Sequence, residues 1–165
     1  MNFLNQLIQH DSWTTQQLLN QCAELSDVQL DQQTDIGHKT IRQTLNHVIR
    51  NMDIWSAIIS DELTPDILKD EAAPTLHQLS FRFRNASKRL AQAAEQIELE
   101  NRWDEAFEDP VDGIKKERGL AIAHILTHSM HHRAQLLYMM RRIGLTDLPE
   151  GDVFSWHQST CTENQ

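Results

Sequence analysis

Apolar residues recur along this chain at intervals of three and four positions, the spacing that places side chains on one face of an α-helix. The pattern predicts four long helices, over about residues 2–24, 40–60, 75–100 and 117–143. Glycine and proline number only five and four, and their scarcity favours long helices over a turn-rich β protein. Four long helices joined by connections of moderate length are typical of an all-α four-helix bundle.

Residue choices at the predicted helix ends support these boundaries. Thr40 and Thr75 each precede a glutamine by three positions. This is the spacing of a capping box, in which the two side chains satisfy backbone N–H groups at a helix N-terminus. Gly144 follows the last long helix, where glycine is common because the residue after the C-terminus often adopts a left-handed conformation.

The connecting segments carry fewer signals. A polar stretch covers residues 26–39, and residues 101–116 are irregular, with an Asp-Gly turn signal that is compatible with a short hairpin. A short last helix is expected after Pro149. No internal repeat, low-complexity tract or linker interrupts the pattern, so residues 1–165 are expected to form a single domain.

Charge and composition exclude several classes of protein. The chain has 24 Asp and Glu against 15 Lys and Arg, a net charge of −9, and no basic stripe that would bind nucleic acid. It has no run of about 18 apolar residues for a membrane span and no basic and apolar N-terminal signal. Its two distant cysteines, Cys22 and Cys161, cannot build a disulfide framework. These features predict a cytoplasmic protein without nucleic-acid or membrane partners.

Histidine is the residue type that points to a function. Nine are present, and four of them fall between His124 and His132. His124, His128 and His132 are spaced four apart, so successive members of this set lie only about 40° apart around the helix axis. His128 and His132 therefore project side by side, close enough to bind one ion. Gln135, one turn further, lies in the same arc.

A third ligand is available on the second predicted helix. His47 lies in a mainly apolar run, between Leu45 and Val48, on or beside the face that should pack inward. Three neutral imidazoles on two facing helices would leave an open position for water or substrate, as in catalytic zinc sites. Imidazole also suits nickel, iron and copper, so the ligands do not select the metal. Asn51 and Trp55, one and two turns further, are candidates for contacts beside such a site.

The same residues allow a plainer interpretation, in which the histidines satisfy one another and bind no metal. Three buried, unpaired imidazoles would be costly without hydrogen bonds or a metal, so both interpretations stay open. His124 could extend the site, support a ligand or line an interface, whereas His131 is expected to form a structural hydrogen bond. Four further histidines are expected at surface or turn positions: His10, His38, His77 and His157.

Two separated strings resemble the metal motifs of the DinB/YfiT-like metalloenzymes, the damage-inducible DinB family. One is HILTHSMHHRAQ, from His124 to Gln135, and the other runs from Thr40 to Trp55 and contains TLNH and D-x-W. The resemblance implies a DinB-like metal-binding helical bundle, usually a homodimer, that holds one divalent ion (Zn, Ni or Fe). The three histidine ligands of the family map onto His47, His128 and His132.

The resemblance also implies a class of reaction. Characterised relatives include transferases and isomerases that use low-molecular-weight thiols, so the expected activity is a metal-dependent thiol S-transferase. Its partners would be a small-molecule thiol and an electrophilic substrate. Asn51 and Gln135 are candidates for orienting metal-bound ligands, and Trp55 is a candidate pocket wall. Two alternatives remain, a non-catalytic metal-binding stress-response protein and a metal-dependent hydrolase.

Two positions depart from the family pattern. Ala134 occupies a position where the family often has glycine, a small-for-small change that should leave the ligands untouched. His38 stands where a small hydroxyl residue is common, near the start of the second predicted helix.

Overall fold

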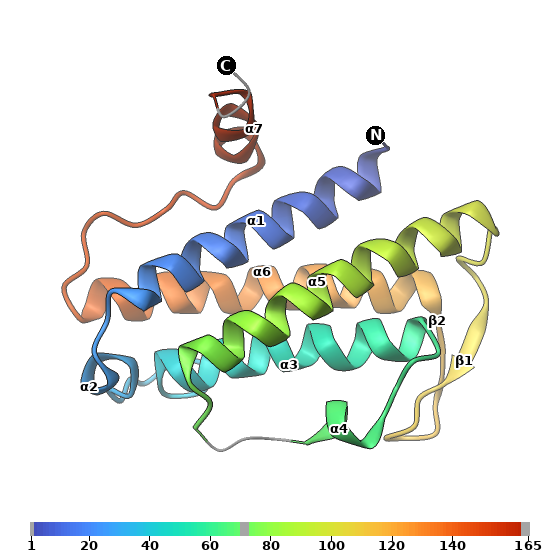
Figure 1. Cartoon of the computed structure of the whole chain (residues 1–165), viewed down its shortest axis with the longest axis horizontal. Coiled ribbons are helices and arrows are strands. Elements are labelled where there is room, and N and C mark those ends of the chain that lie inside the picture. Colours follow the sequence, from blue (N-terminus) through green and yellow to red (C-terminus); the bar gives the residue numbers. More distant parts are fainter. Residues whose placement is uncertain (1, 70–72, 163–165) are drawn as a thin grey trace.

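The computed structural model describes residues 2–69 and 73–162, and four long helices form a bundle (Figure 1). These helices are α1 (Phe3–Ala23), α3 (Ile41–Ile59), α5 (Leu76–Leu99) and α6 (Arg118–Arg142). The shorter elements are the helices α2 (Asp27–Leu30), α4 (Pro65–Leu68) and α7 (Val153–Thr162) and the strands β1 (Ala106–Glu108) and β2 (Lys115–Glu117). The predicted all-α four-helix bundle with a short C-terminal helix is confirmed.

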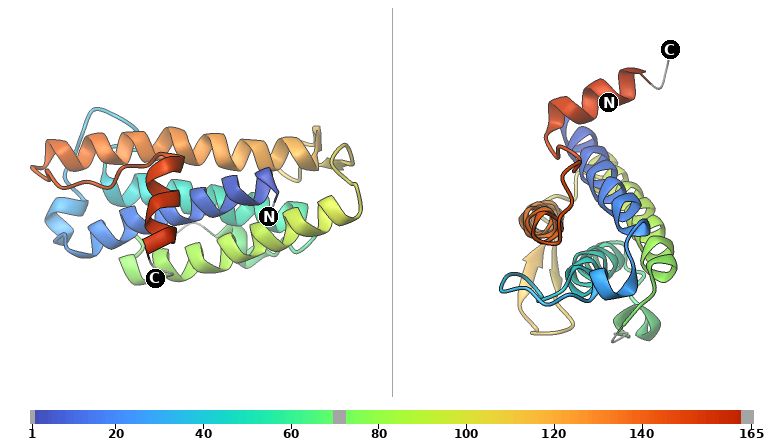
Figure 2. Two further views of the ribbon diagram at one scale, coloured as in Figure 1. Left: turned by 90° about the horizontal axis from the view of Figure 1, so that it is seen from above. Right: turned by 90° about the vertical axis from the view of Figure 1, so that its left-hand side faces the viewer.

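The chain connects the long helices in an order that places two of them diagonally. Helix α3 packs against both α5 and α6, and α1 packs against the same two helices from the other side. Helices α1 and α3 therefore lie opposite each other across the bundle, as the end-on view in Figure 2 shows. Helix α7 lies outside the bundle and contacts α1 (Figure 2). This arrangement makes α3 and α6, the two helices with the histidine motifs, direct neighbours.

Most of the helix-end signals act as the sequence predicts. Thr75 and Gln78 form a complete capping box at the start of α5, and Gly144 adopts a left-handed φ of 97° after α6. At α3 only one hydrogen bond of the predicted capping box forms. The Thr40 side chain accepts the backbone N–H of Gln43, but the reciprocal bond to the Gln43 side chain is not made. One of its two expected hydrogen bonds is sufficient to begin the helix.

The connecting segments agree with the sequence in part. The Asp-Gly turn joins β1 and β2 into an antiparallel hairpin in which Glu108 pairs with Lys115. The four-residue helices α2 and α4 are not predicted, because a single turn is too short to show an apolar period. Cys161 lies in α7, where it is exposed.

The core is built from aliphatic side chains of all four long helices. Fully buried members include Ile8, Leu45, Ile49, Met52, Leu79, Leu90, Ile122, Ile125 and Leu136. Burial of such side chains is the main favourable contribution to folding, at about 1.5–3 kcal/mol each. No helix in the described part of the chain is both long enough and apolar enough to cross a membrane.

A buried ion pair fixes α6 against α1. Arg133 lies in α6 and donates to the carboxylate of Asp11 in α1, and both residues are buried. The same guanidinium nitrogen lies 2.7 Å from Ser129 Oγ and 3.3 Å from Thr15 Oγ1. A charged pair in the interior is tolerated only with such additional hydrogen bonds. The network therefore fixes the side of α6 that faces α1.

A second ion pair joins α3 to α5. Asp53 of α3 is only 7% exposed. Its Oδ1 lies 2.9 Å from Arg89 Nη1, and its Oδ2 lies 3.5 Å from Arg82 Nε. Arg89 also donates to the Asp53 carbonyl oxygen at 3.3 Å. Removal of the carboxylate would leave Arg82 and Arg89 without their buried acceptor, and Arg89 would keep its pair with the exposed Glu62.

We expect Asp53→Ala to lower the free energy of unfolding by about 2–4 kcal/mol, because breaking a largely buried ion pair leaves an uncompensated charge. The matched control is Asp66→Ala, which removes an exposed ion pair with Lys69 and should leave the unfolding midpoint close to that of wild type. Urea unfolding followed by circular dichroism measures both. Equal midpoints for the two variants would show that the buried pair does not contribute more than the exposed one.

Candidate metal centre

Two neighbouring helices place the three predicted ligands close together. His47 belongs to α3, and His128 and His132 stand one turn apart on α6. The centroids of the three rings lie 4.5–4.8 Å from one another. The residues that helical spacing nominates therefore meet in the structure, and their role as ligands is a prediction that this geometry favours.

The closest contact in this group joins two ring nitrogens. His47 Nε2 and His128 Nε2 are 2.9 Å apart, which requires one nitrogen to carry a hydrogen and the other to present a lone pair. The buried Nδ1 of His128 has no hydrogen-bond partner among the residues that the structure describes. Burial, with smaller contributions from His132 and His47, lowers the pKa of His128 to about 3. The ring is therefore neutral at pH 7, the form that binds metals.

Gln135 sets the orientation of the His132 ring. Its Oε1 lies 2.7 Å from His132 Nδ1, and its Nε2 lies 3.0 Å from His131 Nε2. An amide oxygen can only accept, so His132 Nδ1 carries the hydrogen and Nε2 presents its lone pair. Burial lowers the pKa of His132, although the Gln135 hydrogen bond opposes this. His131 accepts from the same amide, so it has the structural hydrogen bond that the sequence predicts.

His38 joins the group from a loop, which the sequence analysis did not foresee. Its ring stacks on His47 with a centroid distance of 3.8 Å and lies 5.4 Å from His132. One ring nitrogen from each of these three histidines lies within 4.8 Å of the others, so they could hold a metal ion. We refer to His38, His47, His128 and His132 as the histidine cluster. The only sequence signal for His38 is its departure from the hydroxyl residue common at that position.

The remaining predicted site residues extend the cluster along α6. The exposed His124 has its ring centroid 5.3 Å from that of His128 and 5.4 Å from that of Trp55. Asn51 Nδ2 lies 3.3 Å from His124 Nε2. Burial lowers the pKa of His124, and the charge of Lys116 lowers it further. The region between the cluster and the neighbouring protein surface is therefore occupied by His124, Asn51 and Trp55.

A cavity of about 340 Å³ opens beside His47, between α3 and the β1–β2 hairpin. Its α3 wall includes Asn51 and the side of Trp55. Lys116 of the hairpin places its Nζ 5.0 Å from the centroid of the Trp55 ring, a cation–π distance. Asp109 and Asp112 pair with the same ammonium group. The cavity therefore combines an aromatic wall, a compensated charge cluster and direct access to one imidazole.

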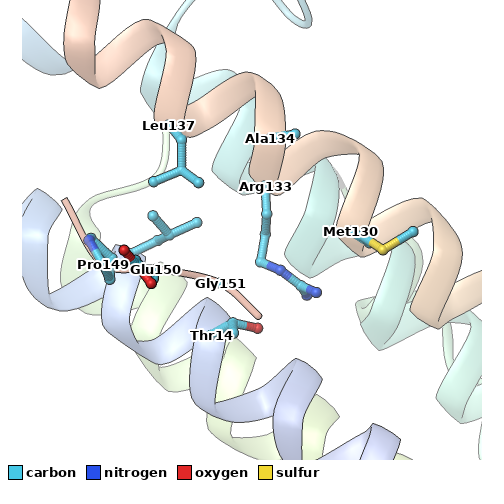
Figure 3. A pocket seen from close by; sticks show the side chains of 9 residues that line it. Thr14, Met130, Arg133, Ala134, Leu137, Pro149, Glu150 and Gly151 are labelled. Carbon is cyan, nitrogen blue, oxygen red and sulfur yellow. The ribbon is translucent and has the colours of Figure 1, made fainter. Parts of the chain in front are cut away.

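A second cavity, of about 150 Å³, lies on the other side of α6 (Figure 3). Figure 3 shows the Arg133 side chain extending across it from α6 towards α1 and Thr14. The walls are mainly apolar and include Leu18, Met130 and Leu137. The Arg133 charge is already compensated by Asp11, and the residues that line this cavity include no histidine or cysteine.

The donor set of the cluster fits a borderline transition-metal ion. Every candidate ligand atom is an imidazole nitrogen, and zinc, nickel, iron and copper accept this donor, whereas magnesium and calcium prefer oxygen. Because the pKa values of His128 and His132 are lowered, these two rings need no proton release at pH 7 before they bind. The contact between His47 Nε2 and His128 Nε2 shows that two ring nitrogens face one region, where a shared ion would take the place of the hydrogen between them.

Comparisons with known proteins identify the family and support the fold. The sequence profile of the DinB family matches residues 1–163. The fold is similar to the crystal structure of a DinB-like protein from Bacillus cereus, with a TM-score of 0.66 and 20% sequence identity over 86% of this chain and 91% of that chain. No curated protein matches the sequence. Because the family profile covers nearly the whole chain, this protein belongs to the DinB family.

Proposed function

We propose that this protein binds one divalent ion, zinc, nickel or iron, through His47, His128 and His132 and uses it to activate a low-molecular-weight thiol. The observation that carries the proposal is the meeting of these three imidazoles, from two helices, at centroid distances of 4.5–4.8 Å. Side chains on helices packed against a core are held more rigidly than side chains on loops. The trio therefore forms a preorganised set of ligands.

Held by His47, His128 and His132, a divalent ion would lower the pKa of a bound thiol, so that the thiol would react as a thiolate. The cavity beside His47 would hold the electrophile, with its apolar part against Trp55. The sulfur forms a bond to the electrophilic carbon, the leaving group departs with the bonding electrons, and the thiol proton passes to solvent. Asn51 borders both the cavity and His124, where it can orient a bound substrate.

A thiol nucleophile suits the charges around this site better than water does. Hydrolysis normally needs a general base, and the two carboxylates that line the adjacent cavity, Asp109 and Asp112, are paired with Lys116. Hydrogen bonds in the cluster join His47 to His128 and His132 to Gln135, and none of these groups is a carboxylate. A thiol has an ordinary pKa of about 8.5, so it needs little further help to ionise near neutral pH.

Metal content tests the ligand set directly. We expect about one equivalent of a divalent ion in untagged wild-type protein and a loss of most of it in His47→Ala and in His132→Ala, since each variant removes one of three ligands. The control is His77→Ala, an exposed histidine of α5 outside the cluster. Mass spectrometry of the metals and circular dichroism of the fold are measured together. A folded wild-type protein that binds no zinc, nickel or iron would show that the histidines are structural.

Activity assays on the metal-loaded protein separate the three candidate functions. We expect it to accelerate the reaction of 2-mercaptoethanol with chlorodinitrobenzene, and His132→Ala to lose the acceleration. Cleavage of nitrophenyl acetate without added thiol would instead identify a hydrolase. Metal binding with neither reaction, across a panel of small thiols and electrophiles, would favour the non-catalytic stress-response protein.

Gln135 provides a test of ligand orientation. Gln135→Ala removes the acceptor for His132 Nδ1, and we expect zinc affinity to fall by about 10–100-fold, the usual effect of removing a hydrogen-bond partner of a metal-bound histidine. Gln135→Glu retains an acceptor and should recover most of the affinity. Competition with a chromophoric chelator measures both variants. Equal affinities for wild type and Gln135→Ala would mean that this hydrogen bond does not position the ligand.

A further inference from the structure

The segment that precedes α3 is folded tightly against the histidine cluster. Thr34 donates its backbone N–H to the carbonyl oxygen of Lys39 at 2.7 Å, and His38 donates its backbone N–H to Thr44 Oγ1 at 3.2 Å. Gly37 and Lys39 both adopt left-handed conformations, with φ of 57° and 74°. A non-glycine residue with positive φ is uncommon and is retained only where its surroundings require it. The backbone on both sides of His38 is therefore fixed.

Gly37 allows this segment to approach α6 closely. A Cβ atom at position 37 would lie 2.8 Å from Gln135 Oε1 and 3.0 Å from Met139 Cε. The first distance is shorter than van der Waals contact, so a side chain here would displace the amide that orients His132, and the φ of 57° independently favours glycine. As a result, the backbone of the next residue, His38, lies close enough for its ring to contact the other histidines of the cluster.

The ring of His38 lies beside the nitrogens that would bind the same ion. It stacks on His47, and one nitrogen from each of His38, His47 and His132 lies within 4.8 Å of the others. Nitrogens bound to one tetrahedral zinc ion, at about 2.1 Å from it, stand about 3.4 Å apart. Because His38 is exposed, rotation of its side chain can close this difference without displacing a packed residue.

We infer that His38 is a fourth, exchangeable ligand, which occupies the coordination position that the three helical histidines leave open. This inference rests on the proposed metal site. Closed four-ligand zinc sites are structural, and sites with three protein ligands are catalytic. A fourth imidazole on an exposed loop allows the site to be either closed or open. His38 would leave the ion when a thiol enters and would return when the product dissociates. The ion is then shielded from adventitious ligands when no thiol is present.

Nitrogen NMR of the histidine side chains tests the inference, because metal-bound and free imidazole nitrogens have different chemical shifts. In zinc-loaded wild-type protein we expect four metal-bound rings, and in His38→Ala and His38→Ser three, with one equivalent of zinc retained in both variants. We also expect zinc affinity to fall at least about tenfold in the variants, as judged by chelator competition. His77→Ala is the control and should match wild type in both measurements.

Addition of 2-mercaptoethanol to the zinc-loaded wild-type protein tests whether the ligand exchanges. We expect the His38 ring alone to return to the shift of free imidazole, while the three helical rings stay bound. Three bound rings in wild type without thiol, equal zinc affinity in His38→Ala, or no release of His38 by thiol would each overturn the inference and leave the three-histidine site intact. Absence of zinc binding in wild type would overturn the proposed function as well.

Discussion

The buried pair of Arg133 and Asp11 is the interaction on which the geometry of the histidines depends. Arg133 directly follows His132, and its partner Ser129 directly follows His128. Consecutive residues of a helix point about 100° apart. When the charged network fixes one side of α6 against α1, the imidazoles are turned towards α3. The helix cannot rotate to present another face without leaving an uncompensated charge in the core.

The sequence predicts what depends on periodicity and on helix-end chemistry. The four long helices, the capping box at Thr75 and the convergence of His47 with His128 and His132 all follow from spacing along single helices and from one assumption, that apolar faces pack together. The hairpin follows from an Asp-Gly turn. Each of these features is a property of neighbouring residues, so a reading along the chain can find it.

The sequence does not predict what depends on contacts between distant segments. His38 looks like a turn residue, because nothing in its neighbourhood indicates that Gly37 will lie against Gln135 of α6. Helices α2 and α4 are single turns, stabilised by the residues around them more than by their own pattern. The pairing of Trp55 with Lys116 likewise joins α3 to a hairpin that is remote in sequence. Such contacts appear only when the helices are assembled.

The placement of Gly37 has a consequence for how this protein tolerates change. A residue without a side chain determines the space for the Gln135 amide, and that amide determines which nitrogen of His132 carries a hydrogen. A residue that binds nothing and has no reactive group therefore influences the geometry of the site. In a screen of variants for function, substitutions of Gly37 would rank with substitutions of the histidines. The structure explains this rank, because the backbone at Gly37 lies against the Gln135 amide.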